Sequence, residues 1–262
     1  MLSYQHIYHA GNLADVQKHG MLAWVLDYMT RKDKPLSYIE THGGRGLYDL
    51  SSFEALKTGE AAAGIAVAEE RGWFASDHPY TAALTQVRGD HGPDAYPGSP
   101  LVAATCLRTM DNLSVAELHP QEFAALDSLL AGRAVRVKKD GIDYARSITP
   151  PTPRRGVMLV DPPYEVKTEY DTVSDLIVQV HRKWNVGVLM LWYPILTSGL
   201  HKPMLSKLTK AIPDGIRHEV TFPPAREGHR MIGSGLFVVN APYGFEAEAK
   251  RLSACFDQLT KG

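Results

Sequence analysis

A carboxylate, two prolines and a tyrosine stand together at positions 161–164, where Asp-Pro-Pro-Tyr directly follows the apolar segment 156–160. Proline fixes its own φ and has no N–H, so the carbonyls of this tetrapeptide stay free as acceptors. An amino group held between the Asp161 carboxylate and the Pro162 carbonyl has an acceptor for each of its two protons. The Tyr164 ring offers a flat surface for a planar base. This motif indicates chemistry on the exocyclic amine of a base, rather than a proline turn with an incidental tyrosine.

Two further motifs are typical of nucleotide binding. Residues 40–46 read Glu-Thr-His-Gly-Gly-Arg-Gly after an apolar strand, 36–40, and glycines there let the backbone approach a ligand closely, although an ordinary turn looks the same. Glu117 ends a second predicted strand, 113–118, where its carboxylate can accept both hydroxyls of a ribose or simply be solvated. The segment between the two motifs exceeds the usual spacing, and a helical insertion accounts for its length.

These residues need a scaffold that brings the ends of their strands together. Apolar strand-like segments alternate with amphipathic segments along the second half of the chain. The predicted strands are 36–40, 113–118, 134–137, 156–160, 186–192, 216–222 and 235–240, and the helices between and after them are 120–130, 142–148, 168–184, 203–212 and 245–259. Such alternation predicts an α/β fold with a mostly parallel seven-stranded sheet covered on both faces. Ligands of such folds bind at the carboxyl ends of the strands, where the motifs lie.

The first hundred residues contain a helix and a candidate insertion. A helix is expected to begin near Asn12, which can cap it. Residues 51–95 are rich in alanine and glutamate, with breaks at Gly59, Gly72 and Pro79, and are interpreted as an inserted helical subdomain of a domain formed by residues 1–50 and 96–262. Residues 96–100 are predicted as a loop, with Ser99 capping the next helix and Pro100 in its first position.

The bulk composition indicates a folded protein of the cytoplasm. The 262 residues suit one large α/β domain, and apolar residues at 44% suffice for its core. Cys106 and Cys255 lie far apart without Cys-x-x-Cys spacing and are expected to be reduced thiols. The N-terminus does not resemble a signal peptide, and no apolar run approaches the roughly 18 residues of a membrane span. The eleven histidines lack an accompanying ligand set, so no metal is expected. Without coiled-coil heptads, a monomer is expected.

With a net charge of -1, a nucleic-acid enzyme must cluster its basic groups. The arginines 154 and 155 precede their strand and therefore lie at the end away from the motifs. Arg226 and Arg230 lie in a glycine-containing loop between the last two strands and are the better candidates for a phosphate contact. The basic clusters are Lys138-Lys139, Arg154-Arg155, Arg182-Lys183, Lys202/Lys207/Lys210 and Arg226/Arg230.

With these residues identified, the chain resembles the Rossmann-like amino-methyltransferases that carry Asp-Pro-Pro-Tyr. It is most similar to the RlmJ-type family of bacterial adenine-N6 methyltransferases of large-subunit ribosomal RNA. The resemblance runs in order from residue 1 to about residue 240. The matching segments are Met1–Tyr4, His9–Asn12, Ala14–Val16 with Lys18-His19, Thr41-His42 with Gly44 and Gly46, Tyr96–Pro100, Glu117–Pro120, Asp161–Glu165 and Trp192–Pro194.

This resemblance implies a class I fold that binds S-adenosylmethionine and carries a small helical insertion, with ribosomal RNA as partner, in protein-free or early assembly form. It implies catalytic roles for Asp161, Pro162 and Tyr164, and contact of RNA with Tyr4 and Tyr164. The residues implied to bind the cofactor are Lys18, His19, His42, Gly44, Ser99, Glu117, Asp140, Gly141 and Asp161. Without the resemblance, Asp140-Gly141 is typical of a turn. The chain departs from the family pattern at Glu40, Arg45 and Leu47, which bear on affinity more than on the reaction.

Three alternatives remain open at this stage. A DNA adenine-N6 methyltransferase shares the same motifs but normally needs a larger recognition region than the roughly 45-residue insertion. A protein glutamine methyltransferase uses a related tetrapeptide that usually begins with Asn, so Asp161 counts against it. A non-catalytic RNA-binding module is disfavoured because Asp161, Glu117 and the glycine turn are intact.

Overall fold

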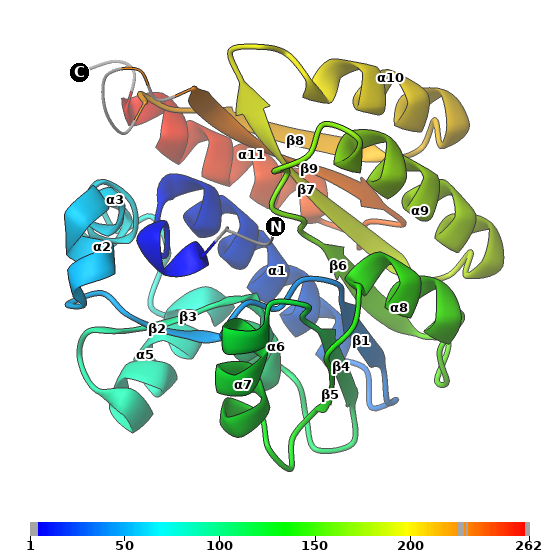
Figure 1. Cartoon of the computed structure of the whole chain (residues 1–262), viewed down its shortest axis with the longest axis horizontal. Helices are drawn as coiled ribbons and strands as arrows, with labels where there is room; N and C mark the ends of the chain where they lie inside the picture. The colour runs from blue at the N-terminus through cyan, green and yellow to red at the C-terminus, as the bar shows by residue number, and fades with distance from the viewer. Residues whose placement is uncertain (1–4, 225–227, 229, 260–262) are drawn as a thin grey trace.

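Seven strands form the central sheet of the computed structural model, which describes residues 5–224, 228 and 230–259 (Figure 1). The strands, in spatial order, are β5 (Val135–Val137), β4 (Asn112–Ala116), β1 (Ser37–Glu40), β6 (Gly156–Val160), β7 (Val188–Leu196), β9 (Met231–Val239) and β8 (Ile216–Thr221). The first five are parallel to one another, and β9 runs antiparallel to both of its neighbours. The predicted mostly parallel, seven-stranded α/β fold is confirmed, and the carboxyl ends of the first five strands meet at one edge.

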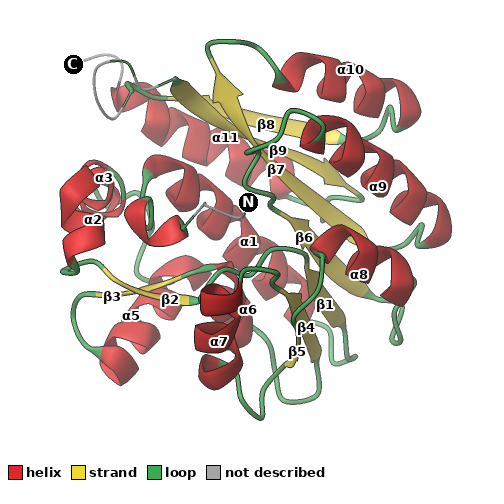
Figure 2. Cartoon of the chain, viewed as in Figure 1, coloured by secondary structure: helices red, strands yellow, loops and turns green. Residues whose placement is uncertain are grey.

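Helices cover both faces of the sheet because its central strands are apolar on both sides (Figure 2). Along β6, Val157 and Leu159 belong to one core cluster and Met158 and Val160 to the other, as the alternation of side chains in a strand requires. The first cluster packs α1 (Leu13–Thr30), α6 (Ser99–Cys106), α7 (Pro120–Leu129) and α11 (Phe245–Phe256). The second packs α8 (Gly141–Ile148), α9 (Glu169–Lys183) and α10 (His201–Ala211).

Helix α1 follows a short 3-10 turn, His6–Tyr8, and begins where the sequence predicts. Asn12 is its N-cap, and the Asn12 side chain accepts a hydrogen bond from the Asp15 N–H at 2.9 Å. The helix is buried nearly all round, and its buried residues include four polar ones, Asp15, Gln17, Lys18 and His19. Gln17 donates to the His218 carbonyl at 3.1 Å, whereas Asp15, Lys18 and His19 share another face of the helix. Burying polar groups is costly unless they are paired, so the face of Asp15, Lys18 and His19 marks a site rather than ordinary core.

The segment between residues 47 and 97 contains more than helices. Strands β2 (Leu47–Asp49) and β3 (Ala95–Pro97) pair antiparallel and flank α2 (Phe53–Thr58), α3 (Glu60–Ala63), α4 (Ile65–Glu70) and α5 (Pro79–His91). The predicted breaks at Gly59, Gly72 and Pro79 are confirmed, whereas the loop predicted at 96–100 is wrong at its start, because Tyr96 pairs with Tyr48. A three-residue strand is too short to show a period in the sequence.

The predicted cap of α6 is also wrong. Gly98 is the N-cap, and Ser99 is the first helical residue. The Ser99 hydroxyl donates a hydrogen bond to the buried Glu40 carboxyl at 2.5 Å instead of accepting one from the helix. Cys106 and Cys255 are free thiols. Among the helices of the described residues, none combines the length and apolarity that crossing a membrane requires.

Candidate active site

A cavity of about 570 Å³ opens where the carboxyl ends of the parallel strands meet the first half of α1. Its walls contain every residue predicted to bind the cofactor or to act in catalysis. Those residues are Lys18, His19, His42, Gly44, Ser99, Glu117, Asp140, Gly141, Asp161, Pro162 and Tyr164. Tyr4, predicted to contact RNA, lies outside the described residues. Residues from six separate segments of sequence therefore converge on one space.

Glycines at the floor of the cavity permit approaches that a side chain would block. A Cβ on Gly43 would lie 2.4 Å from the Val115 side chain, and a Cβ on Gly141 would lie 1.8 Å from the Thr41 carbonyl oxygen. Gly44 has φ +57°, which favours glycine. Helix α8 can therefore begin directly against the end of β1, beside the exposed backbone of the glycine turn.

Glu117 follows the last residue of β4, and two backbone N–H groups orient its carboxylate. Its Oε2 accepts from Gly44 at 2.8 Å, and its Oε1 accepts from His119 at 2.7 Å. Burial raises the pKa of Glu117, against the effect of these hydrogen bonds. Each oxygen keeps a second lone pair, so the carboxylate can also accept two hydroxyl groups that enter the cavity.

Ser99 reaches the cavity in front of a fully buried carboxyl group. Glu40 accepts from Ser99 through Oε1 and from the Tyr38 hydroxyl through Oε2 at 2.8 Å. Burial raises the pKa of Glu40 to about 8, although both hydrogen bonds oppose the shift. Because the Ser99 hydroxyl donates inward to Glu40, its lone pairs are the part left for a ligand in the cavity.

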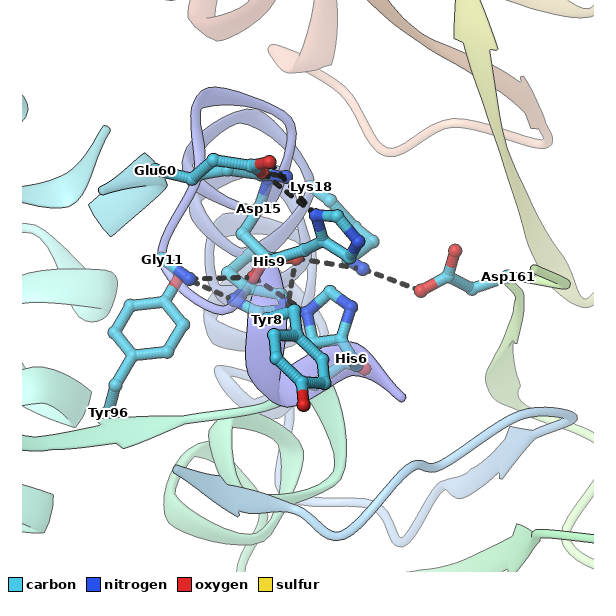
Figure 3. A network of polar contacts seen from close by, with 12 residues as sticks. His6, Tyr8, His9, Gly11, Asp15, Lys18, Glu60, Tyr96 and Asp161 are labelled. Atoms are coloured by element: carbon cyan, nitrogen blue, oxygen red, sulfur yellow. Dashed lines mark hydrogen bonds and ion pairs between the residues drawn. The ribbon is translucent and has the colours of Figure 1, made fainter. Parts of the chain in front are cut away.

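Asp161, at the end of β6, is tied to α1 by a buried lysine. The Lys18 ammonium donates to Asp161 Oδ2 at 2.5 Å and lies 3.1 Å from Asp15 Oδ1 (Figure 3). Burial alone would lower the pKa of Lys18, but the Asp161 and Asp15 carboxylates together raise it. The lysine is therefore cationic and holds one oxygen of the Asp161 carboxylate in a fixed position.

Asp15 is a residue of this site that sequence reasoning missed. It is 1% exposed, and its Oδ2 accepts from the Gly11 N–H at 3.0 Å and lies 2.8 Å from His6 Nε2. Burial would raise the pKa of Asp15, but His6, Lys18 and His19 lower it well below its usual range. The available signal was its spacing, because a carboxylate three and four residues before a lysine and a histidine shares their helix face.

Burial disfavours the charged form of two histidines of the cavity, His19 and His42. Burial lowers the pKa of His19 to about 3, and its Nδ1 lies 3.0 Å from the Tyr96 hydroxyl. Burial also lowers the pKa of His42, despite the opposing effect of Asp161 and Asp140. At neutral pH both imidazoles therefore offer hydrogen bonds rather than positive charge to a ligand.

Tyr164 and Trp192 form the wall beside Asp161. The Tyr164 hydroxyl donates to the Trp192 carbonyl at 2.7 Å, and the Tyr164 ring packs on Tyr170 with centroids 4.5 Å apart. Trp192 Nε1 donates to Ser234 at 2.8 Å, and Lys18 Nζ lies 5.4 Å from the centre of the indole. The sequence pointed to Trp192 only as part of a matching segment, and the structure adds it to the cavity wall.

The predicted basic clusters lie at different distances from the cavity. Arg230 lines the cavity, whereas Arg226 lies outside the described residues. Arg154 donates to the Lys183 carbonyl at 3.2 Å and Arg155 to the Lys34 carbonyl at 3.1 Å, so both hold the opposite edge of the sheet, as expected. Within residues 5–224, 228 and 230–259, no cluster of histidine, cysteine and acidic side chains is arranged to hold a metal ion.

The sheet order, the reversed strand β9 and a cavity at the carboxyl edge define the Rossmann-like fold of a class I S-adenosylmethionine-dependent methyltransferase. The family model of Ribosomal RNA large subunit methyltransferase D, RlmJ, matches residues 33–260, and the chain belongs to this family of ribosomal RNA methyltransferases.

Individual relatives are similar over nearly the whole chain. The chain is 37% identical to Ribosomal RNA large subunit methyltransferase J of Escherichia coli K12, over 95% of this chain and 90% of the relative. It is 36% identical to the protein of that name from Haemophilus influenzae, over 96% of this chain and 92% of that relative. A crystal structure of a Legionella pneumophila protein superposes with a TM-score of 0.86 at 33% identity, covering 96% of this chain and 94% of that one.

The cavity fits S-adenosylmethionine, the cofactor of this class. Gly43 and Gly141 let the backbone pack closely on Val115 and Thr41 at the cavity floor, next to carboxylates at Glu117 and Asp140 that can accept from a nucleoside. Ser99 presents lone pairs to a group that donates hydrogen bonds. The predicted cofactor set therefore has the donor, acceptor and steric character that the group requires.

Replacing Gly141 with alanine is expected to disrupt this close packing. The new methyl group cannot coexist with the Thr41 carbonyl at 1.8 Å, so α8 must move away from β1. We expect a loss of about 1–3 kcal/mol in the free energy of unfolding and weaker binding of S-adenosylmethionine. Urea unfolding and calorimetry measure the two effects. Gly89→Ala is the control, because a Cβ there meets nothing within 4 Å, and equal effects of both changes would contradict the steric argument.

Proposed function

We propose that the protein methylates the exocyclic N6 amine of a specific adenine in large-subunit ribosomal RNA. The observation that carries the proposal is one cavity in which Asp161, Pro162 and Tyr164 adjoin the glycine turn and Glu117. An amine needs two acceptors, a planar base needs a flat wall, and the cofactor needs a nucleoside site. All three requirements are met by residues of the same cavity.

In the proposed mechanism, Asp161 and the Pro162 carbonyl prepare the amine. The amine of adenine is a poor nucleophile because its lone pair is delocalised into the ring, and hydrogen bonds to two acceptors localise that pair. Lys18 occupies Oδ2 of Asp161, so Oδ1 is the oxygen left to accept from the amine or to take its proton. When bound, S-adenosylmethionine supplies an electrophilic methyl group on a cationic sulfonium. The cavity must hold the amine within about 3–3.5 Å of that methyl group.

The target adenine must leave its stack, which costs a few kcal/mol, and we propose that Tyr164 recovers part of this cost. Tyr164→Ala is expected to lower kcat/KM for RNA roughly 5- to 150-fold, which corresponds to a loss of about 1–3 kcal/mol in stacking free energy. The change in cofactor affinity is expected to be much smaller. Tyr164→Phe keeps the ring, loses the hydrogen bond to the Trp192 carbonyl and is expected to retain most activity. Steady-state kinetics measures kcat/KM for RNA, and calorimetry measures the affinity of each variant for S-adenosylmethionine. Equal losses in RNA turnover and cofactor binding would make Tyr164 a structural residue.

The proposal extends to the form of the substrate and the organisation of the chain. We propose that the substrate is protein-free or early-assembly ribosomal RNA, that the reaction takes place in the cytoplasm and that the enzyme acts as a monomer. Tyr4 is proposed to contact the RNA.

Residues 51–95 are proposed to be an insertion into the methyltransferase domain of residues 1–50 and 96–262. Glu60 of this insertion contacts His9 at 3.0 Å and Asn12 at 3.1 Å.

The test of the proposed function uses labelled S-adenosylmethionine and three substrates: protein-free ribosomal RNA from a strain lacking the enzyme, assembled subunits, and duplex DNA. The products are digested to nucleosides and analysed by mass. N6-methyladenosine in naked RNA is the expected result. Label confined to DNA would support the DNA adenine-N6 methyltransferase alternative, and no label despite bound cofactor would contradict a nucleic-acid substrate.

A further inference from the structure

A second groove lies outside the cavity and is lined by residues of α10 and of β8, the outermost strand of the sheet. It has a volume of about 620 Å³ and is open to solvent. One face of α10 and two residues of β8 supply its polar side chains, Lys202, Ser206, Thr209, Lys210, Arg217 and Glu219. The groove therefore offers three cationic groups and two hydroxyls against a single carboxylate.

The two lysines of this groove are less well neutralised than the lysine on the other side of the same helix. Lys207 points away from the groove and pairs with Asp175 at 2.8 Å. Lys202 and Lys210 have no carboxylate within ion-pair distance in the part of the chain that the structure describes. A protein with net charge -1 thus concentrates uncompensated positive charge here.

The single carboxylate of the groove is already engaged. Glu219 Oε1 accepts from the Tyr193 hydroxyl at 2.9 Å, and Glu219 Oε2 lies 3.6 Å from Arg217 Nε. The Tyr193 ring also stacks on His201, with centroids 5.9 Å apart and an interplanar angle of 16°. Glu219 and His201 therefore form a fixed wall, and the free cations remain available to an anion.

The groove and the active-site cavity share strand β7, but they lie on its two opposite faces. Trp192 and Pro194 line the cavity, while Tyr193 between them contacts the groove residues His201 and Glu219. Two consecutive turns lead from Leu196 in the cavity wall to Lys202, closed by hydrogen bonds from Gly199 N to Leu196 O at 2.9 Å and from Lys202 N to Gly199 O at 3.0 Å. The first turn of α10, which carries Lys202, therefore lies only two turns along the chain from the cavity wall.

We propose that this groove binds the phosphodiester backbone of the substrate RNA outside the active-site cavity. The inference rests on the proposed function, since it assigns a second contact to the same RNA. Lysine ammonium groups and hydroxyls are typical phosphate contacts, which fix position on a nucleic acid without reading its sequence. The groove thus holds the backbone while the cavity holds the base.

The test measures binding of a ribosomal RNA fragment by fluorescence anisotropy, which does not depend on methyl transfer. Lys202→Glu/Lys210→Glu is expected to weaken RNA binding roughly tenfold at moderate salt and to reduce the slope of log Kobs against log salt by roughly 1.4–1.8, two phosphate contacts' worth. In turnover, KM for RNA rises while kcat and the affinity for S-adenosylmethionine stay unchanged. Lys202→Gln/Lys210→Gln is expected to weaken RNA binding as well, by a smaller factor. This neutral variant replaces the charge-reversed one in the test if the charge-reversed one folds poorly.

Lys207→Glu is the control for each single variant, Lys202→Glu and Lys210→Glu, because it makes the same charge change on the same helix outside the groove. We expect it to leave the RNA affinity and the salt slope at wild-type values. If the Lys202/Lys210 variants bind RNA as tightly as the wild type, the proposal is overturned, and the groove would then serve a protein instead. The proposal is also overturned if Lys207→Glu weakens RNA binding by the same factor. Failure of the proposed function is seen separately, as wild-type protein that transfers no methyl group to RNA, whatever the binding result.

Discussion

Replacing Asp161 with alanine is expected to lower kcat for methyl transfer to RNA about 10²–10³-fold, the usual effect of removing a preorganised partner of the reacting group. The change removes the carboxylate oxygen that faces the amine, while the Lys18 ammonium keeps its contact with Asp15 at 3.1 Å. The fold and the cofactor site are therefore expected to survive. Single-turnover kinetics with labelled S-adenosylmethionine gives the rate, and calorimetry shows that the cofactor still binds.

Asp161→Asn separates the two roles assigned to the carboxylate. Asparagine can still accept a hydrogen bond from the amine, but it cannot take up the released proton. We expect a smaller loss than for alanine if orienting the amine is the main role, and an equal loss if proton uptake is. Asp143→Ala is the control, since the Asp143 side chain is 78% exposed on α8. Wild-type turnover by an Asp161→Ala protein that binds cofactor would remove Asp161 from the mechanism.

The sheet could be predicted because its strands carry strong local signals. The continuous apolar run of β6, Gly156–Val160, has the bounds expected from the sequence, and each of the other six strands lies close to its predicted segment. The pair β2 and β3 was missed because each has three residues, and because it is held by contacts between segments almost fifty residues apart. Ser99 was misassigned for a similar reason: its true partner, Glu40, is distant in sequence.

The site could be predicted to the extent that strand ends carry motifs. Asp161, Glu117 and the glycine turn follow strands, and parallel strands necessarily bring their carboxyl ends together. Asp15 lacked such a signal, because an acidic residue in the first turn of a helix is ordinarily a dipole partner on the surface. What makes it unusual is complete burial together with Lys18, which depends on how α1 packs against the sheet.

The groove beside α10 also could not be predicted from the sequence, because it depends on which partner each charged side chain meets in the fold. The sequence presents Lys202, Lys207 and Lys210 as one basic cluster, although they divide between two faces of a single helix. The structure pairs Lys207 with Asp175 and leaves the other two beside β8. Charge composition therefore identifies the helix, while the partner of each lysine identifies the face with unbalanced charge.

Lys18→Met is expected to destabilise the protein by about 3–5 kcal/mol, because it leaves two carboxylates without the cation buried between them. Lys18 is 4% exposed and Asp15 is 1% exposed, so water solvates the two carboxylates far less well than it would at the surface. Turnover should fall as well, since Asp161 loses the contact that orients it. Lys207→Met is the control, because its pair with Asp175 is solvent-exposed and an exposed pair contributes about 1 kcal/mol or less. Urea unfolding of both variants gives the comparison.

The pH dependence of this deficit identifies its cause. The folded-state pKa of Asp15 is lowered, partly by Lys18, so its contribution to stability is complete above the unfolded pKa of about 4 and is lost as pH falls below it. Without Lys18, Asp15 protonates more readily, which relieves the unpaired charge. The deficit of Lys18→Met is therefore largest near pH 7 and shrinks toward pH 4. A deficit independent of pH, or equal to that of Lys207→Met, would mean that lost packing rather than buried charge destabilises the variant.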